Sequence, residues 1–381
     1  KNEKPNRTGF AHFFEHLLFE GSKHIKRGEF FKYIENAGGQ NNANTTNDRT
    51  FYYEVLPSNQ LELGLWLESE RLLHANINQD GVDTQNEVVK EEKRLRVDNQ
   101  PYGSFFAEIN KRAFKEHPYK WTTIGEMEHL DAATLDEFID FYHKFYVPEN
   151  AILSIAGDID VAYTKQLISS YFGTIPRGKG DIEKVSIVEP PLGGEIRDTI
   201  YDDIQLPGVM MAYRAPKQGD EDFYAIEMMS KILSDGESSR LNKTCVEKSQ
   251  SAMYCGSFPY ASEDPGLSFV YSIANSGVDP LDLELEINKE LKLLQTTLVT
   301  EKEMRKIRNM IENDFVGNFT SMIGIAENLA NYKMYFGDAN LINTELNRYL
   351  KVTREDIMRV ANDYFKPSNR VILYYLPNEK G

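Results

Sequence analysis

The sequence predicts a protein of mixed helices and strands that folds as two related domains, and three observations support this prediction. Its 381 residues are too many for one ordinary hydrophobic core. Residues 134–153 and 353–372 match in character without gaps, each as a capped amphipathic helix, a Pro-Asn turn and an apolar strand. Glycines and prolines collect over residues 178–195, where we expect the link. We therefore predict domains at 1–185 and 186–381.

Composition limits the classes of function. A hydrophobic content of 41% indicates a folded protein, and a formal net charge of −16 without a basic stripe argues against nucleic-acid partners. We find no apolar run long enough to span a membrane and no signal peptide at the start. Because the first residue is Lys1 rather than Met and the histidine pair follows only eleven residues later, we expect that an upstream segment has been processed, cleaved or left out of this sequence. Cys245 and Cys255 are expected to be buried thiols rather than a disulfide framework.

The first predicted helix carries the segment His12-Phe13-Phe14-Glu15-His16. At about 100° per residue the two histidines lie roughly 40° apart around the helix, so both rings can reach one metal ion. Glu15 precedes the second histidine, which is the inverse of the common His-Glu-x-x-His order and a zinc-hydrolase signature. The segment predicts a metal pair with an adjacent base, although His12 could instead be an ordinary core histidine.

A catalytic zinc needs a third protein ligand, and a second helix offers one. Residues 83–97 read as a charge-rich helix with Asp83 as its cap and with Val88 and Leu95 on its apolar side. Glu91 and Glu92 point about 100° apart, so only one can face the histidines. We predict that it is Glu92.

Between these two helices we expect a strand over Asn44–Leu56, which is rich in threonine and aromatic residues. Such a polar strand could pair with an extended peptide, or it could be an ordinary exposed edge. Residues 59–74 and 281–297 read as helices with apolar core stripes.

The two copies of the repeat each end in an expected strand, at Ala151–Ala156 and Arg370–Leu376. The early helix of the second domain, at 225–233, has no metal-ligand pair. The other histidines lack paired spacing and are expected to have ordinary structural roles: His24, His74, His117, His129 and His143.

With the inverted motif, the distant glutamate and two related halves, the chain resembles the pitrilysin/insulinase superfamily of zinc peptidases. It is most similar to the bacterial relatives of the mitochondrial processing peptidase. The resemblance covers nearly the whole chain and is carried by Gly9–Ser22, Gly39–Thr46, Glu87–Glu92, Gly236–Leu241 and Asn369–Pro377.

This resemblance implies an α+β fold of two homologous domains, each an antiparallel-rich sheet flanked by helices. It implies one Zn²⁺ per chain with His12, His16 and Glu92 as ligands, and Glu15 as the general base. It also implies that substrate peptide lies along an edge strand through Asn42, Ala43 and Asn44, within a chamber enclosed by the two domains.

The chain departs from the family pattern at three places. There is no room before the metal helix for the strands that usually precede it, so the first sheet is expected to be incomplete. Gln85 stands where many relatives have a second glutamate that supports the site. Where relatives have an Arg and a Tyr that bind the substrate backbone, this chain has Ile325 and Tyr332, so a partner subunit could supply the guanidinium.

The resulting prediction is a zinc-dependent metalloendopeptidase that cleaves peptides or unfolded polypeptides. The alternatives are a non-catalytic or partner-dependent peptide-binding subunit of a paired peptidase, and a metal-dependent hydrolase acting on other substrates. We expect a homodimer or a heterodimer with a homologous subunit. The bacterial periplasm or cell envelope is favoured over the cytoplasm, and the natural substrate is not specified by the sequence.

Overall fold

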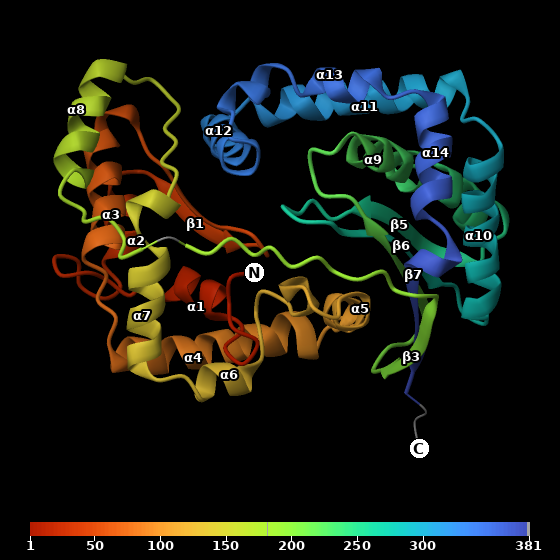
Figure 1. Cartoon of the computed structure of the whole chain (residues 1–381), viewed down its shortest axis with the longest axis horizontal. Helices are drawn as coiled ribbons and strands as arrows, with labels where there is room; N and C mark the ends of the chain where they lie inside the picture. The colour runs from red at the N-terminus through yellow and green to blue at the C-terminus, as the bar shows by residue number, and fades with distance from the viewer. Residues whose placement is uncertain (181, 379–381) are drawn as a thin grey trace. The chain divides into compact units, whose positions relative to one another are not determined.

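The protein combines helices with two β-sheets (Figure 1). The computed structural model describes residues 1–180 and 182–378. The α-helices are α1 (Phe10–Leu17), α2 (Phe30–Asn36), α3 (Leu61–Leu73), α4 (Gln79–Lys93), α5 (Phe105–Ala113), α6 (Met127–Asp131), α7 (Leu135–Phe145), α8 (Val161–Phe172), α9 (Glu221–Ser234), α10 (Pro280–Thr296), α11 (Glu301–Asn318), α12 (Met322–Phe336), α13 (Leu346–Lys351) and α14 (Arg354–Tyr364). The strands are β1 (Gln40–Thr45), β2 (Thr50–Val55), β3 (Ile196–Asp202), β4 (Gly208–Ala215), β5 (Ala252–Pro259), β6 (Gly266–Ala274) and β7 (Arg370–Pro377).

The chain forms two compact units whose segments alternate along the sequence. Unit 1 consists of Lys1–Leu95, Trp121–Ser186 and Asn318–Ile342. Unit 2 consists of the remaining segments, Arg96–Lys120, Ile187–Gly317 and Asn343–Gly381. These units are defined by which segments pack together. The predicted division between residues 185 and 186 separates homologous domains, and it stays a prediction.

Unit 2 is built on a five-stranded sheet with the order β3-β7-β4-β6-β5. Only the β3–β7 pair is parallel, and the other pairs are antiparallel. Both faces of β4 are covered, because Val209, Met211 and Tyr213 join one hydrophobic cluster while Met210 and Ala212 join another. The sheet of unit 2 is therefore antiparallel-rich, as predicted.

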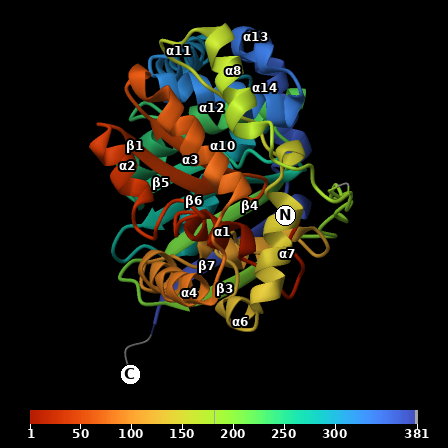
Figure 2. The same ribbon diagram turned by 90° about the vertical axis from the view of Figure 1, so that its left-hand side faces the viewer.

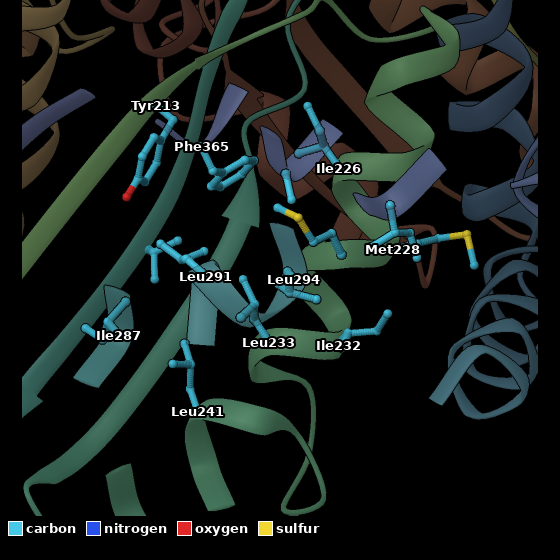
Figure 3. Close-up of a cluster of buried hydrophobic side chains, with 14 of the residues drawn as sticks. Tyr213, Ile226, Met228, Ile232, Leu233, Leu241, Ile287, Leu291, Leu294 and Phe365 are labelled. Carbon is cyan, nitrogen blue, oxygen red and sulfur yellow. The ribbon is translucent and has the colours of Figure 1, made fainter. Parts of the chain in front are cut away.

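Helices cover the two faces of this sheet. On one face α9, α10 and α14 contribute to the larger cluster, and Figure 3 shows Leu233 of α9 beside Leu294 of α10. The ring of Tyr213 lies 4.6 Å from that of Phe365, centroid to centroid. On the other face α5 supplies buried side chains. The expected helices at 225–233 and 281–297 are confirmed as α9 and α10.

Unit 1 contains the antiparallel hairpin of β1 and β2, in which Ala43 is opposite Tyr52. The expectation of a single strand over Asn44–Leu56 was wrong, because a turn interrupts it. The Thr46 hydroxyl accepts hydrogen bonds from the backbone N–H groups of Asp48 (3.4 Å) and Arg49 (3.2 Å). Side chains such as threonine stabilise turns by such local bonds.

The repeated segment has the same local structure in both copies. Thr134 and Thr353 each cap a helix in a reciprocal capping box, for α7 and α14. After each helix the asparagine of a Pro-x-Asn turn donates to a carbonyl at the helix end, Asn150 to Phe145 (2.9 Å) and Asn369 to Tyr364 (2.8 Å). The helix and turn of the repeated segment are thus repeated in the structure.

The two copies differ after the turn. Residues Arg370–Pro377 form β7, as expected, and pair with β3 and β4. Residues 151–156 were also expected to form a strand, and this prediction was wrong: they are irregular, and Ile152 and Leu153 are each 45% exposed. A strand requires a ladder partner, and in the described residues this segment pairs with no strand.

The second metal-motif helix also differs from its predicted bounds. α4 begins at Gln79 rather than Asp83, with the Asn78 side chain accepting from the backbone of its first turn. Val88 and Leu95, placed on the apolar side, are 42% and 55% exposed. After Lys93 the chain continues as a π-helical segment, Arg94–Asp98, in which the helical phase changes.

The core of unit 1 that bears on the site is aromatic. α1 packs against α4 and α7, as Figures 1 and 2 also show. The buried residues of this cluster are Phe10, Phe13, Phe14, Leu17, Leu18, Val82, Val89, Leu130, Phe138 and Tyr142.

Among the described residues, no helix is sufficiently long and apolar to cross a bilayer.

Candidate metal centre

The start of α1 is fixed by two residues. Gly9 is the N-cap with φ of 91°, and a Cβ atom there would lie 2.7 Å from the backbone oxygen of Ile124. The Glu3 carboxylate accepts hydrogen bonds from the backbone N–H groups of Gly9 (3.0 Å) and Ala11 (2.8 Å). Burial raises the pKa of Glu3 despite the bond from Ala11, which acts in the opposite direction. The first turn of the metal-motif helix is therefore held in place.

The apolar face of α1 determines where its polar groups point. Phe13 and Phe14 are fully buried, and the ring of Phe10 stacks on that of Phe138 at a centroid distance of 4.7 Å. Because these side chains occupy the core side, His12 and His16 share another face of the helix. Their rings lie 4.9 Å apart between centroids.

α4 brings one of its two adjacent glutamates to these histidines. Val82 and Val89 anchor the helix in the core, and Glu92 follows Val89 by three residues on a neighbouring face. Glu91 points elsewhere and pairs with Arg94 at 3.2 Å, with its side chain 56% exposed. The choice of Glu92 rather than Glu91 agrees with this geometry.

The structure brings three predicted ligands together. Oε2 of Glu92 lies 3.4 Å from Nε2 of His12 and 3.1 Å from Nε2 of His16. One ligand atom from each residue lies within 4.8 Å of the others. The imidazoles of His12 and His16 beside it hold the pKa of Glu92 well below its usual range, against the effect of burial. The carboxylate is thus ionised at neutral pH.

The donor set fits a zinc ion. Two imidazole nitrogens and one carboxylate oxygen are a ligand combination of catalytic zinc sites, which keep a fourth position for water or substrate. The side chains are 11% exposed at His12, 24% at His16 and 16% at Glu92, so the cluster is mostly shielded yet reachable from solvent. That these residues bind zinc stays a prediction.

Glu15 is held by the first strand. Its Oε2 accepts a hydrogen bond of 2.5 Å from the hydroxyl of Thr45, the last residue of β1, and Thr45 also lies 3.3 Å from the Thr50 hydroxyl on β2. Sequence reasoning missed Thr45, because the pairing depends on where the hairpin packs against α1. This hydrogen bond fixes the orientation of the Glu15 carboxylate.

Gln85 lies two helical turns before Glu92 on α4, which places both residues on one side of the helix. Its side-chain amide donates a hydrogen bond to Glu20, which follows α1 and also pairs with Arg27. The residue thus links α4 to the segment after α1. Its predicted support of the metal site stays a prediction.

The expected peptide-docking residues lie on β1. Asn42 and Asn44 are exposed and Ala43 is half-buried, in the alternation typical of a strand. The backbone N–H of Ala43 donates to the side-chain oxygen of Asn42 at 2.9 Å. This local bond occupies a main-chain donor of the strand.

Tyr332 and Ile325 both lie on α12, which packs against β2 within unit 1. Tyr332 is 6% exposed, so most of its surface is covered. A residue that sequence reasoning missed lies beside them: Arg49 donates to Asn331 (2.5 Å) and to Glu327 (2.6 Å) of the same helix. No sequence pattern joins positions so far apart, and only the fold reveals the contact.

Comparison with protein families and curated proteins gives consistent results. The profile described as "Insulinase (Peptidase family M16)" matches residues 1–126, and that described as "Peptidase M16 inactive domain" matches residues 132–311. The chain is 29% identical over 379 residues to the zinc protease PqqE of Helicobacter pylori, covering 99% of this chain and 85% of that protein. It is 24% identical over 386 residues to the mitochondrial-processing peptidase subunit beta of Blastocladiella emersonii, covering 99% and 82%.

Solved structures share the fold. A crystal structure of a protease from Helicobacter pylori superposes with a TM-score of 0.94 at 29% identity, covering 99% of this chain and 91% of that chain. The periplasmic protease PqqL of Escherichia coli superposes with a TM-score of 0.76 at 18% identity, covering 99% of this chain and 44% of that chain.

Proposed function

The chain belongs to the insulinase family of M16 peptidases, and from that premise we propose that it is a zinc-dependent endopeptidase acting on peptides or unfolded polypeptides. The observation that carries this proposal is the convergence of His12, His16 and Glu92 from α1 and α4. The relatives named zinc proteases support it.

The roles of the ligand residues follow from their chemistry. His12 and His16 would bind the metal through Nε2, and Glu92 through its carboxylate, whose negative charge offsets part of the charge of the ion. A bound zinc supplies a water of lowered pKa and polarises the carbonyl of the scissile peptide bond.

Glu15 is proposed as the general base. Its carboxylate would accept a proton from the attacking water and later deliver it to the amine that leaves. The hydrogen bond from Thr45 orients this carboxylate. Because the donor is a neutral hydroxyl, the bond does not neutralise the negative charge that lets Glu15 act as a base. A glutamine at position 15 could not accept the proton.

We also propose that substrate pairs with β1 as an added strand. In that case main-chain groups of an extended peptide would bond to the backbone through Asn42, Ala43 and Asn44. The Ala43 N–H, which now donates a hydrogen bond to the Asn42 side chain, would donate to a substrate carbonyl instead. Tyr332 is kept as a further substrate-binding candidate.

A partner-dependent peptide-binding subunit is the second candidate function. It is favoured by Ile325, which stands where the family pattern predicts arginine, and by a relative that is itself a named subunit. In this case the chain would work as a homodimer or with a homologous partner. The periplasm or cell envelope is the proposed location, in line with the periplasmic protein that shares this fold.

Two measurements on the purified protein test the main proposal. We expect cleavage of quenched peptides that stops on chelation and returns with Zn²⁺. By elemental analysis we expect about one zinc per chain at His12, His16 and Glu92, measured as the zinc lost when His12 and His16 are replaced by alanine. Zinc binding without cleavage, with cleavage appearing only after a homologous protein is added, would support the second candidate instead. Absence of both zinc and cleavage would refute the main proposal.

A further inference from the structure

A second cluster of metal-ligating side chains lies in unit 1, outside the candidate metal centre. It consists of His24, Glu70 and His74, whose ligand atoms lie within 4.8 Å of one another. His24 belongs to the segment between α1 and α2, Glu70 lies in the last turn of α3, and His74 is the C-cap residue of that helix. Glu70 and His74 are four residues apart, so they share one side of the helix end.

The backbone around the cluster is fixed by hydrogen bonds between the two segments. The N–H of Lys23 donates to the carbonyl of His74 at 2.9 Å, and Ser22 forms an antiparallel bridge with Ala75. The two histidines are therefore carried by neighbouring, paired stretches of chain. A site whose ligands are held in this way loses little conformational entropy on binding an ion.

The side chains are also oriented before any ion binds. The Ser22 hydroxyl donates to Oε2 of Glu70 at 2.5 Å, while Oε1 of Glu70 lies 2.9 Å from Nδ1 of His24. The rings of His24 and His74 lie 5.2 Å apart at 86°. A serine that orients a ligating carboxylate is the kind of supporting contact that metal sites use.

The burial of the cluster is uneven. The Glu70 side chain is 7% exposed, whereas that of His24 is 50% exposed. The Glu70 carboxylate thus lies at the base of the cluster, with the two imidazoles beside it and solvent on the side of His24.

We propose that His24, Glu70 and His74 form a second site for a divalent metal ion that favours imidazole ligands, represented by Zn²⁺. Two nitrogens and one carboxylate oxygen suit zinc, nickel or copper, whereas magnesium and calcium prefer oxygen ligands alone. Tetrahedral bonds of about 2.0 Å separate ligand atoms by about 3.3 Å, which a small movement of the exposed His24 ring achieves. The ion would join the segment after α1 to the end of α3.

The test uses full-length protein in which His12 and His16 are both replaced by alanine, which removes the first site. After equilibration with Zn²⁺ and removal of excess ion, we expect elemental analysis to find one zinc per chain. Adding His24→Asn and His74→Asn should abolish this binding, whereas adding His143→Asn, on the exposed part of α7, should leave it unchanged. Zinc-free protein in the first background, or binding that survives loss of both His24 and His74, would overturn the proposal.

A graded variant guards against loss of fold. Ser22→Ala in the same background removes the bond to Glu70 but none of the ligands, and we expect zinc affinity measured by calorimetry to fall about 10- to 100-fold. Unchanged affinity would contradict the assigned role of Ser22. The readouts are independent of peptide cleavage: failure here leaves cleavage by the unmodified protein intact, whereas failure of the proposed peptidase function leaves this second equivalent of zinc intact.

Discussion

Glu15 and Glu92 carry the same functional group but have different partners in the structure. Glu92 lies against both imidazoles, whereas Glu15 accepts a bond from the Thr45 hydroxyl. We predict that Glu15→Gln retains zinc and loses at least 100-fold in peptide cleavage, because the proton acceptor is gone while the ligands remain. Zinc content and cleavage rate should be measured on the same sample, and Thr45→Val, which keeps the base, should be affected less.

Glu92→Gln should have the opposite signature. We expect zinc affinity to fall because a charged ligand becomes neutral, and cleavage to recover in part when excess Zn²⁺ is supplied. Glu91→Gln is the matched control, since Glu91 is exposed and pairs only locally with Arg94 among the bonds described. Equal zinc loss in the Glu15 and Glu92 variants would contradict the assigned roles.

For single residues, the sequence predicted those site positions that follow from the geometry of one helix. The angle of about 100° per residue places His12 and His16 on one face and separates Glu91 from Glu92. Contacts that depend on packing of distant segments could not be predicted in this way. Thr45 lies on β1 and bonds to Glu15 on α1. His24 lies close to His74 because the backbone N–H of the adjacent Lys23 bonds to the His74 carbonyl.

At the scale of elements, the beginning of α11 shows how one ion pair links two segments of unit 2. Arg240 lies 2.7 Å from Glu303, and Thr300 donates to the same carboxylate through its N–H and its hydroxyl. Burial would raise the pKa of Glu303, but these bonds outweigh it and hold the pKa at about 2, below the ordinary 4.5.

This lowered pKa predicts a pH dependence of stability. A carboxyl with a lower pKa in the folded state stabilises fully above pH 4.5, and the contribution is lost as pH falls from 4.5 towards 2. We expect Glu303→Gln to reduce the free energy of unfolding by about 2 kcal/mol at pH 7 and by much less near pH 2. Urea unfolding at both pH values checks this, and Glu301→Gln, whose side chain is 75% exposed, should change little.

A second prediction concerns how α12 is attached to the β1–β2 hairpin. Arg49 donates to Glu327 and Asn331, and its side chain is 14% exposed. We expect Arg49→Ala to speed hydrogen exchange of the α12 backbone about tenfold, because hydrogen bonds to charged groups are worth about 1.5–3 kcal/mol. Arg177→Ala, at a side chain that is 90% exposed, should leave α12 unchanged. An unaffected α12 in the Arg49 variant would show that other contacts hold it.

Helices and strands were predicted well where the local sequence determines the element, and poorly where pairing with a distant segment determines it. The capping threonines of α7 and α14 marked both helix starts, since a cap acts on its own first turn. The strand after each helix carried a similar apolar pattern, yet only Arg370–Pro377 pairs as a strand. Periodicity also placed Val88 and Leu95 incorrectly, because the buried face of α4 runs through Val82 and Val89, and Leu95 lies in the π-helical segment after Lys93.

At the scale of the whole molecule, metal binding should act on one unit. All three ligands of the candidate centre lie in unit 1, and so does the proposed second cluster. An ion at 100 times its Kd stabilises the state that binds it by about 2.7 kcal/mol. We therefore predict that Zn²⁺ slows hydrogen exchange in α1 and α4 by up to about 100-fold and leaves β4 and β6 unchanged. Equal protection in both units would contradict this, and Glu92→Gln should reduce the effect.

The alternation of segments between the two units has a consequence for synthesis on the ribosome. A nascent chain that has passed residue 92 already holds every ligand of the candidate metal centre, but the segment Asn318–Ile342 that completes unit 1 is still to be translated. Unit 2 likewise has its Arg96–Lys120 portion made long before β7, which lies inside its sheet between β3 and β4. Unit 1 cannot be completed before Asn318–Ile342 is made, so translation interrupted between residues 120 and 318 should yield fragments in which neither unit is complete.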